Sequence, residues 1–176
     1  RENIMIALET VFLRALEPED INVLFSIEND SSLQSFSTHN GPYSRFILRR
    51  YLEQQNQSIY EQQQQRLVIS DQSKNALGLV DLFEFEPKSK RAGVGLVVLA
   101  PYRKMGVAKK ALTLLEKYVI DNYDLHMLHA DVLSSNLASC RLFESCKFVE
   151  MGIKREWYYI DSTYQDAKFY QKLLKR

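Results

Sequence analysis

The alternation of apolar and polar residues along the chain predicts strands and helices in turn. Residues 11–16 form a short apolar run, and Pro18 after it fits the first position of a helix. Leu24 and Ile27 continue at helical spacing, which predicts a helix with one inward face. The same patterns predict a helix from about residue 44, strands at 67–70, 76–86, 92–100 and 127–133, helices beginning near 106 and 137, and a closing hairpin at 149–159 and 164–173 that turns at Asp161 and Ser162.

Two polar segments separate these elements. Residues 29–43 are rich in Ser, Asn, Gly and Pro, which is typical of a loop. Residues 54–66 are rich in glutamine, and we interpret them as the solvated end of the helix that begins near residue 44. The three strands between 67 and 100 are joined by short turns, so an antiparallel meander is expected. These elements predict one domain, residues 1–176, of mixed α/β (α+β) class with a largely antiparallel central sheet.

Composition limits the class of partner. The 176 residues, 45% hydrophobic and 26% charged, suffice for one core and are too few for two ordinary domains. Lys and Arg number 23 against 22 Asp and Glu, so the basic excess of a nucleic-acid-binding protein is missing. Residues 1–100 carry 10 basic and 13 acidic side chains, and residues 101–176 carry 13 and 9. This asymmetry fits a cationic partner for the first part and a small phosphate-bearing partner for the second.

The sequence also argues against a membrane partner and a metal. No run approaches the roughly 20 apolar residues of a membrane span, and the first ten residues lack the layout of a signal peptide, so a cytoplasmic protein is expected. Cys140 and Cys146 lie six residues apart, unlike a redox pair or a zinc knuckle. His126 and His129 are three apart on a predicted strand and face opposite sides, so no metal site is expected.

One junction has the residues of a phosphate-binding site. The strand at 92–100 is followed by a basic turn with Arg103 and Lys104 and by a helix that begins at Gly106. Main-chain N–H groups at a helix start have no partner within the helix and lie at the positive end of its dipole, so they can bind a phosphate. A P-loop is excluded because no Gly-Lys-Ser/Thr triplet occurs, and a dinucleotide motif is excluded because Gly93 and Gly95 lack the third glycine.

The junction resembles the acyl-CoA pyrophosphate loop of the GNAT superfamily of N-acetyltransferases, Gln/Arg-x-x-Gly-x-Gly/Ala, and reads Arg103-Lys104-Met105-Gly106-Val107-Ala108. The stretch from Asn136 to Glu144, with Phe148 after it, resembles the Asn-x-x-Ser-x-x-Leu-Tyr-Glu block of the same family. The resemblance extends over about residues 11–174. Within the superfamily the sequence most resembles bacterial spermidine and diamine N-acetyltransferases, and ribosomal-protein N-terminal acetyltransferases share much of the layout.

The resemblance implies a GNAT fold, in which about four helices flank a mixed, mostly antiparallel sheet that is splayed at the acyl-CoA site. It implies acetyl-CoA as cosubstrate, a small-molecule amine that attacks the thioester directly, and it permits a homo-oligomer. Asn136 is expected both to hold the CoA arm and to cap a helix. The residues that the resemblance assigns to acetyl-CoA are Val97, Val98, Leu99, Arg103, Lys104, Met105, Gly106, Val107, Ala108, Asn136, Ser139 and Phe143.

Three positions depart from the family pattern. Phe143 stands where many relatives carry a Tyr that protonates the leaving thiolate, and Gly93 stands where relatives often carry a Glu that serves as base. Lys147 replaces a glycine before Phe148. A thiol is a tolerable leaving group, so the loss of the Tyr hydroxyl slows the reaction without forbidding it.

The base and the acceptor contacts must therefore come from other residues, because an alkylammonium with a pKa near ~10.4 has to lose a proton before it attacks. Asp81 and Glu84 lie three apart on one predicted strand, so regular geometry turns only one of them toward the active site, and we favour Glu84 as base. Glu28, Asp30, Asp81 and Tyr158 are the expected acceptor-binding residues, since carboxylates and aromatic rings attract a cation. Each carboxylate also fits a solvated surface position.

Three functions remain open. The preferred one is an acetyl-CoA-dependent N-acetyltransferase that acts on a polyamine or a similar small amine. The first alternative is a protein N-terminal acetyltransferase. The second is a CoA-binding module with weakened catalysis, which Phe143 and Gly93 motivate.

Overall fold

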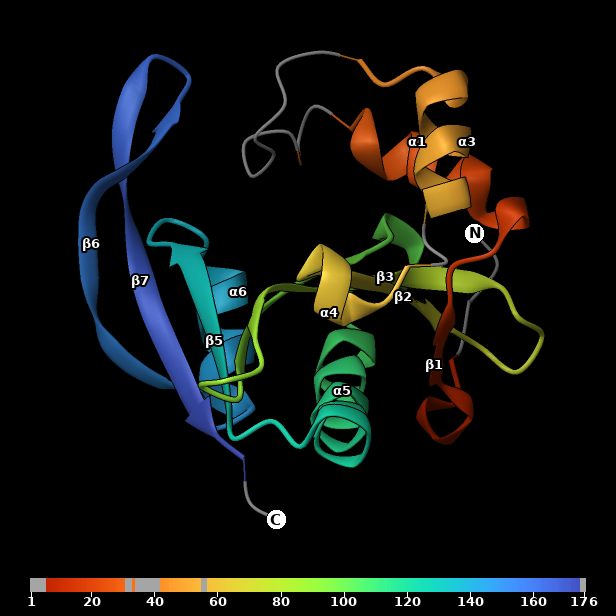
Figure 1. Cartoon of the computed structure of the whole chain (residues 1–176). Helices are drawn as coiled ribbons and strands as arrows, with labels where there is room; N and C mark the ends of the chain where they lie inside the picture. Colours follow the sequence, from red (N-terminus) through yellow and green to blue (C-terminus); the bar gives the residue numbers. More distant parts are fainter. Residues whose placement is uncertain (1–5, 31–32, 34–41, 55–56, 175–176) are drawn as a thin grey trace.

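A computed structural model describes residues 6–30, 33, 42–54 and 57–174, and within these ranges the chain forms a seven-stranded sheet with helices on both faces (Figure 1). The strands are β1 (Phe12–Ala15), β2 (Gln65–Ser70), β3 (Ala76–Glu86), β4 (Arg91–Val98), β5 (Met127–Leu133), β6 (Val149–Ile160) and β7 (Thr163–Leu173). The α-helices are α1 (Ile21–Glu28), α3 (Arg45–Gln54), α4 (Ile59–Gln62), α5 (Val107–Tyr123) and α6 (Leu137–Ser145). The predicted mixed α/β class is confirmed.

The strands lie in the order β1-β2-β3-β4-β5-β7-β6. β1 to β4 pair antiparallel, as the predicted meander requires, and β5, β7 and β6 form a second antiparallel group. The two groups meet where β4 and β5, both fully described, run parallel over three register pairs: Arg91 with Met127, Ala92 with Leu128 and Gly93 with His129. Beyond Gly93 the two strands separate, so the sheet is open at this point.

Alternating side chains of β3 divide the core between the two faces of the sheet. Val80 and Leu82 pack in a cluster with buried residues of α5 and α6, whereas Leu79 packs with Leu24 of α1 and Leu48 of α3. Figure 1 shows α5 on one side of the sheet and α1 and α3 on the other. Burial of each such side chain contributes roughly 1.5–3 kcal/mol, so both faces hold the sheet rigidly.

The glutamine-rich tract is not the end of one helix, as we interpreted it. α3 ends at Gln54, and Ser58 begins the separate helix α4 by accepting a hydrogen bond from the N–H of Tyr60 (3.1 Å). The tract then enters β2 at Gln65 and Arg66. Ser58 and Glu61 form a capping box, which is the local reason why a new helix starts there. α4 raises the helix count of the described ranges to five, against about four expected.

The closing hairpin is confirmed, and it extends beyond the rest of the sheet (Figure 1). Asp161 and Ser162 both have left-handed φ angles, 49° and 63°, as a two-residue hairpin turn requires. The predicted loop at 29–43 lies mostly outside the described residues. In the ranges that the structure describes, no helix is long and apolar enough to cross a membrane.

Candidate active site

The opening between β4 and β5 belongs to a cleft of about 900 Å³, which we call the main cleft. Such a volume accommodates a large part of a drug-sized ligand. Residues 94–97 of β4 and 131–133 of β5 form its floor, the start of α6 closes one end, and α1 and α3 supply one wall. Its described lining includes the side chains of Glu28, Arg50, Tyr51, Arg66, Asp81, Phe83, Asp131, Asn136, Ser139 and Phe143.

β4 presents a main-chain edge to this opening. The N–H of Leu99 donates to the carbonyl of Leu77 on the β3 side (2.9 Å). Because main-chain groups of successive strand residues point to opposite sides, Val97 also faces β3, whereas Leu96 and Val98 face the gap left by β5. Arg103 Nε donates to the carbonyl of Val98 (2.8 Å). An extended ligand with amide groups can therefore pair with this edge, with Leu96 better oriented for it than Val97 or Leu99.

The helix start after β4 has the geometry that anion binding needs. Gly106 is the N-cap of α5 and has a left-handed φ of 83°. Lys110 N–H donates to the carbonyl of Gly106 (3.0 Å), so the N–H groups of the three preceding residues have no acceptor within the helix. Arg103 and Lys104 are exposed in the same turn. A Cβ at Gly106 would lie 3.0 Å from Leu8 Cδ1, which adds a steric reason for glycine to the backbone one.

The start of α6 brings three predicted residues to one wall of the main cleft. Asn136 Oδ1 accepts a hydrogen bond from the N–H of Ser139 (3.0 Å), so its predicted role as N-cap is confirmed. Asn136, Ser139 and Phe143 all line the cleft, as their spacing along one helix face requires. The ring of Phe143 packs edge-on against Phe148 (centroids 5.0 Å apart) and stacks on Tyr170 (6.1 Å).

Two of the predicted acceptor carboxylates, Glu28 and Asp81, are joined by an arginine that the sequence analysis missed. Arg66 Nη1 lies 2.5 Å from Glu28 Oε1, while its Nε and Nη2 donate to the two oxygens of Asp81 (2.6 and 3.0 Å). The guanidinium also lies over the ring of Tyr51 (5.7 Å to the centroid). Burial alone would lower the pKa of Arg66, but the charge and hydrogen bonds of Asp81 and the charge of Glu28 outweigh this effect. The net pKa is raised, so Arg66 stays charged. Arg66 lies opposite Asp81 in the β2–β3 hairpin, a pairing that only the register of the two strands establishes.

Glu84, the predicted base, lies at a bulge in β3 and has a left-handed φ of 48°. The bulge interrupts the alternation of side chains along β3, so the direction of Glu84 cannot be inferred from that of Asp81 by regular strand geometry. Its carboxylate is 74% exposed and lies 3.9 Å from His129 Nε2. His129 is buried, and burial is the main cause that lowers its pKa, so the ring is neutral at pH 7.

The described residues that line the main cleft do not include Glu84, Asp30 or Tyr158. Tyr158 lies close enough to Asp131 and Glu84 for their charges, added to its burial, to raise its pKa. Three side chains therefore lie beside the main cleft, close to Asp131 of its floor: Glu84, His129 and Tyr158.

The ring of Phe83 leaves no room for a side chain at Gly93. A Cβ at Gly93 would lie 2.3 Å from Cε2 of the Phe83 ring, and Phe83 itself lines the main cleft. A Glu at this position, as the family resemblance expects, would displace the ring. The structure thus explains this departure by packing.

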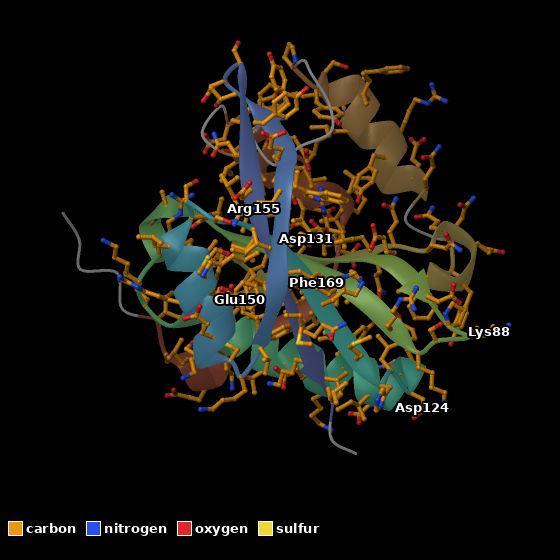
Figure 2. The ribbon with its side chains drawn as sticks, turned by 90° about the vertical axis from the view of Figure 1, so that its left-hand side faces the viewer. Lys88, Asp124, Asp131, Glu150, Arg155 and Phe169 are labelled. Atoms are coloured by element: carbon orange, nitrogen blue, oxygen red, sulfur yellow. The ribbon has the colours of Figure 1, made fainter. Side chains whose placement is uncertain are left out.

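Asp131 is a further carboxylate in the cleft, and sequence reasoning did not select it. Its two oxygens lie 2.7 and 2.8 Å from Nζ of Lys154 on β6. Figure 2 shows Asp131 and its register partner Phe169 beside each other at the β6–β7 hairpin. In the described part of the chain, no group of three or more His, Cys, Asp or Glu side chains could hold a metal ion, and Cys140 and Cys146 are buried free thiols.

A sheet that opens between two parallel strands, with unpaired helix N–H groups where the first strand ends, can bind an extended, phosphate-bearing ligand, as the resemblance to acyl-CoA-dependent transferases leads us to expect. The model of the acetyltransferase (GNAT) domain matches residues 10–149, and the chain belongs to this family. GNAT acetyltransferases use acetyl-CoA as donor, and the protein is an N-acetyltransferase.

Several known proteins are similar over nearly the whole chain. Spermidine N(1)-acetyltransferase of Vibrio cholerae is 29% identical over 156 residues, which are 89% of this chain and 88% of the relative. An uncharacterized prophage-derived N-acetyltransferase of Bacillus subtilis, YokL, is 28% identical over 90% of this chain and 87% of its own. Among solved structures, the Vibrio cholerae spermidine N-acetyltransferase in complex with CoA and spermine superposes with a TM-score of 0.85 at 26% identity, covering 94% of this chain and 96% of that one.

Proposed function

We propose that the protein transfers the acetyl group of acetyl-CoA to a primary amine of a polyamine or a similar small polycation. The observation that carries the proposal is that one cleft combines the free edge of β4 with an acidic lining. The charged side chains that line it are the carboxylates Glu28, Asp81 and Asp131 and the guanidinium groups of Arg50 and Arg66. With Glu84 beside the cleft and Lys154 on Asp131 included, four carboxylates face three cations, and this excess of one negative charge favours a cationic acceptor over an anionic one. The relatives named as spermidine acetyltransferases support the same substrate class.

The donor is expected to bind along β4 and the starts of α5 and α6. The N-terminal N–H groups of α5, together with Arg103 and Lys104, fit the pyrophosphate of the donor, and the edge of β4 and the face of α6 with Asn136 fit its amide-containing arm. We assign to these contacts the positioning of the thioester for attack by the acceptor nitrogen, and to a main-chain N–H of the β4 edge the stabilisation of the oxyanion. When the C–S bond breaks, Phe143 has no proton to give, so the thiolate leaves unprotonated; the nitrogen loses its second proton to solvent as the amide forms, and the thiolate takes up a proton from solvent.

We assign removal of the acceptor's proton to Glu84. Its exposed carboxylate lies beside the cleft, and His129, whose pKa burial lowers, gives it no cationic partner at pH 7. Asp81 and Asp131 are less suited because each is bound to a cation, Arg66 or Lys154. The Glu84→Gln variant should lower kcat and shift the activity profile to higher pH. Glu150→Gln, which removes a carboxylate paired with Lys168 on the hairpin, is the matched control and should leave both unchanged.

Release of free thiol from acetyl-CoA tests the proposed activity, with spermidine, spermine, putrescine and short peptides as acceptors. Turnover with the polyamines and none with the peptides is the expected result. Turnover with peptides alone would establish an N-terminal acetyltransferase instead. CoA binding by calorimetry without acceptor-dependent release would leave only a CoA-binding module.

We also propose a cytoplasmic homo-oligomer. Two buried free thiols and a donor made inside cells fit the cytoplasm. Large apolar side chains are exposed on the hairpin, among them Met151, Tyr159 and Tyr164, which favours burial against another copy. The Vibrio cholerae spermidine acetyltransferase has a dodecameric structure that superposes with a TM-score of 0.79 at 27% identity, over 94% of this chain and 95% of that one. Sedimentation velocity would measure the state, and a monomer at micromolar concentration would contradict the proposal.

A further inference from the structure

The ammonium group of Lys154 lies in a cage of one carboxylate and two aromatic rings. Nζ is 2.7 Å from Asp131 Oδ1 and 2.8 Å from Oδ2. The same atom lies 4.5 Å from the ring centroid of Trp157 and 4.7 Å from that of Phe169. Both rings are within the distance at which an aromatic face attracts a cation.

Three strands build this cage. Asp131 on β5 is paired with Phe169 on β7, and Lys154 on β6 is paired with Ala167, two residues before Phe169, so all three side chains share one face of the sheet. The register of β6 is then interrupted between Lys154 and Tyr158, where Glu156 has a left-handed φ of 51°. This irregularity allows Trp157, three residues after Lys154, to lie against the lysine ammonium.

The cage is connected to the main cleft through Asp131, which lines it next to Val132 and Leu133 at the opening of the sheet. Its outer side is open to solvent, because Trp157 is exposed and Lys154 is only half-buried. The long lysine side chain can therefore leave the cage by rotating its own torsions, without any movement of the strands. What remains after it leaves is a carboxylate that is 19% exposed with Lys154 in place, beside two aromatic rings, and this combination suits an alkylammonium.

We propose that Asp131, Trp157 and Phe169 form an ammonium subsite of the acceptor cleft, and that Lys154 is its resident occupant, which a second ammonium of a diamine or polyamine must displace. The inference rests on the proposed function, since it names where a further charge of the acceptor binds. Lys154 then acts as an internal competitor. It weakens the binding of acceptors with several charges and leaves acceptors with a single charge unaffected.

The test compares butylamine, 1,4-diaminobutane and spermine as probes of Lys154→Met. Methionine keeps the aliphatic contacts with the rings and removes the charge. Removal of the competitor should tighten the binding of 1,4-diaminobutane and spermine about tenfold, measured by calorimetry without acetyl-CoA, and lower their KM similarly, with no change for butylamine. Lys168→Met is the matched control, because it removes a hairpin lysine that pairs with Glu150 (2.8 Å) on the other face. Lys154→Arg keeps the charge and should keep the wild-type discrimination.

Asp131→Asn gives the opposite expectation, namely that binding of the two polyvalent amines weakens more than binding of butylamine, and it decides the question even if Lys154→Met does not fold. An equal effect on all three amines, or an equal effect of Lys154→Met and Lys168→Met, would overturn the subsite and leave only a change of overall charge. Tighter binding of 1,4-diaminobutane in Lys154→Met without acetylation of any amine would support the subsite and refute the proposed function. Acetylation of polyamines with no difference between the variants would support the proposed function and refute the subsite.

Discussion

Replacement of Arg66 by methionine tests whether the acidic wall of the main cleft depends on one guanidinium. Arg66 holds Glu28 and Asp81 through contacts of 2.5, 2.6 and 3.0 Å. The side chains of Arg66, Glu28 and Asp81 are 21%, 17% and 33% exposed. Methionine fills much of the space over Tyr51 but leaves two neighbouring carboxylates without a counter-charge. We therefore expect a loss of stability that exceeds the loss of packing.

The size of the loss follows from the burial of the group. Breaking a fully buried ion pair by removing one partner costs about 3–5 kcal/mol, and exposed pairs are worth about 0–1 kcal/mol. Between 17% and 33% of each of these side chains is exposed to water, so we expect the free energy of unfolding to fall by about 2–3 kcal/mol. With a urea dependence of about 2–3 kcal/mol per molar for a domain of this size, the midpoint of unfolding should fall by about 1 M.

Urea unfolding followed by far-UV circular dichroism measures this change, and a double-mutant cycle assigns it. Asp81→Asn in the Arg66→Met background should cost less than it costs alone, with a coupling energy of about 1 kcal/mol or more. Lys117→Met is the control, since Lys117 pairs with Asp121 on the exposed surface of α5 and should cost less than about 0.5 kcal/mol. Equal midpoints for Arg66→Met and Lys117→Met would refute the reasoning.

Three further predictions concern single side chains of the site. Burial lowers the pKa of His129 in the folded protein, so below about pH 6.5 the unfolded chain binds a proton that the folded one does not. The free energy of unfolding should therefore fall as the pH decreases from about 7 to about 5. His129→Gln should flatten this dependence, and an unchanged pH dependence in chemical denaturation would contradict it. Phe143→Tyr restores a hydroxyl on the face of α6 that lines the cleft and should raise kcat; unchanged turnover would show that no acid is needed there. Asn136→Ala should lower the free energy of unfolding by about 1 kcal/mol and weaken CoA binding, while Asn136→Ser, which keeps a capping oxygen, should recover the stability.

Features that depend on local chemistry were predictable from the sequence. The α5 start at Gly106, the Asn136 cap and the turn at Asp161 and Ser162 each follow from residues within one turn of the chain. The tract before β2 was misinterpreted because its polar composition hid the capping signal of Ser58.

Features that depend on register were not predictable. Arg66 and Asp81 are 15 residues apart, and Lys154 and Asp131 are 23 apart, so their contacts exist only once the strands pair in one register. The bulge at Glu84 adds a residue to β3 and breaks the alternation from which its direction was inferred.

The short parallel pairing of β4 with β5 has a consequence for how the protein holds its donor. These two strands, described throughout, share three register pairs, whereas β5 and β7 share seven. A ligand chain that lies along the free edge of β4 extends the hydrogen-bonded ladder where the protein's own strands stop. A donor bound there as proposed would act as an added strand beside β4, and amide exchange of β4 should then be slower with the donor than without it.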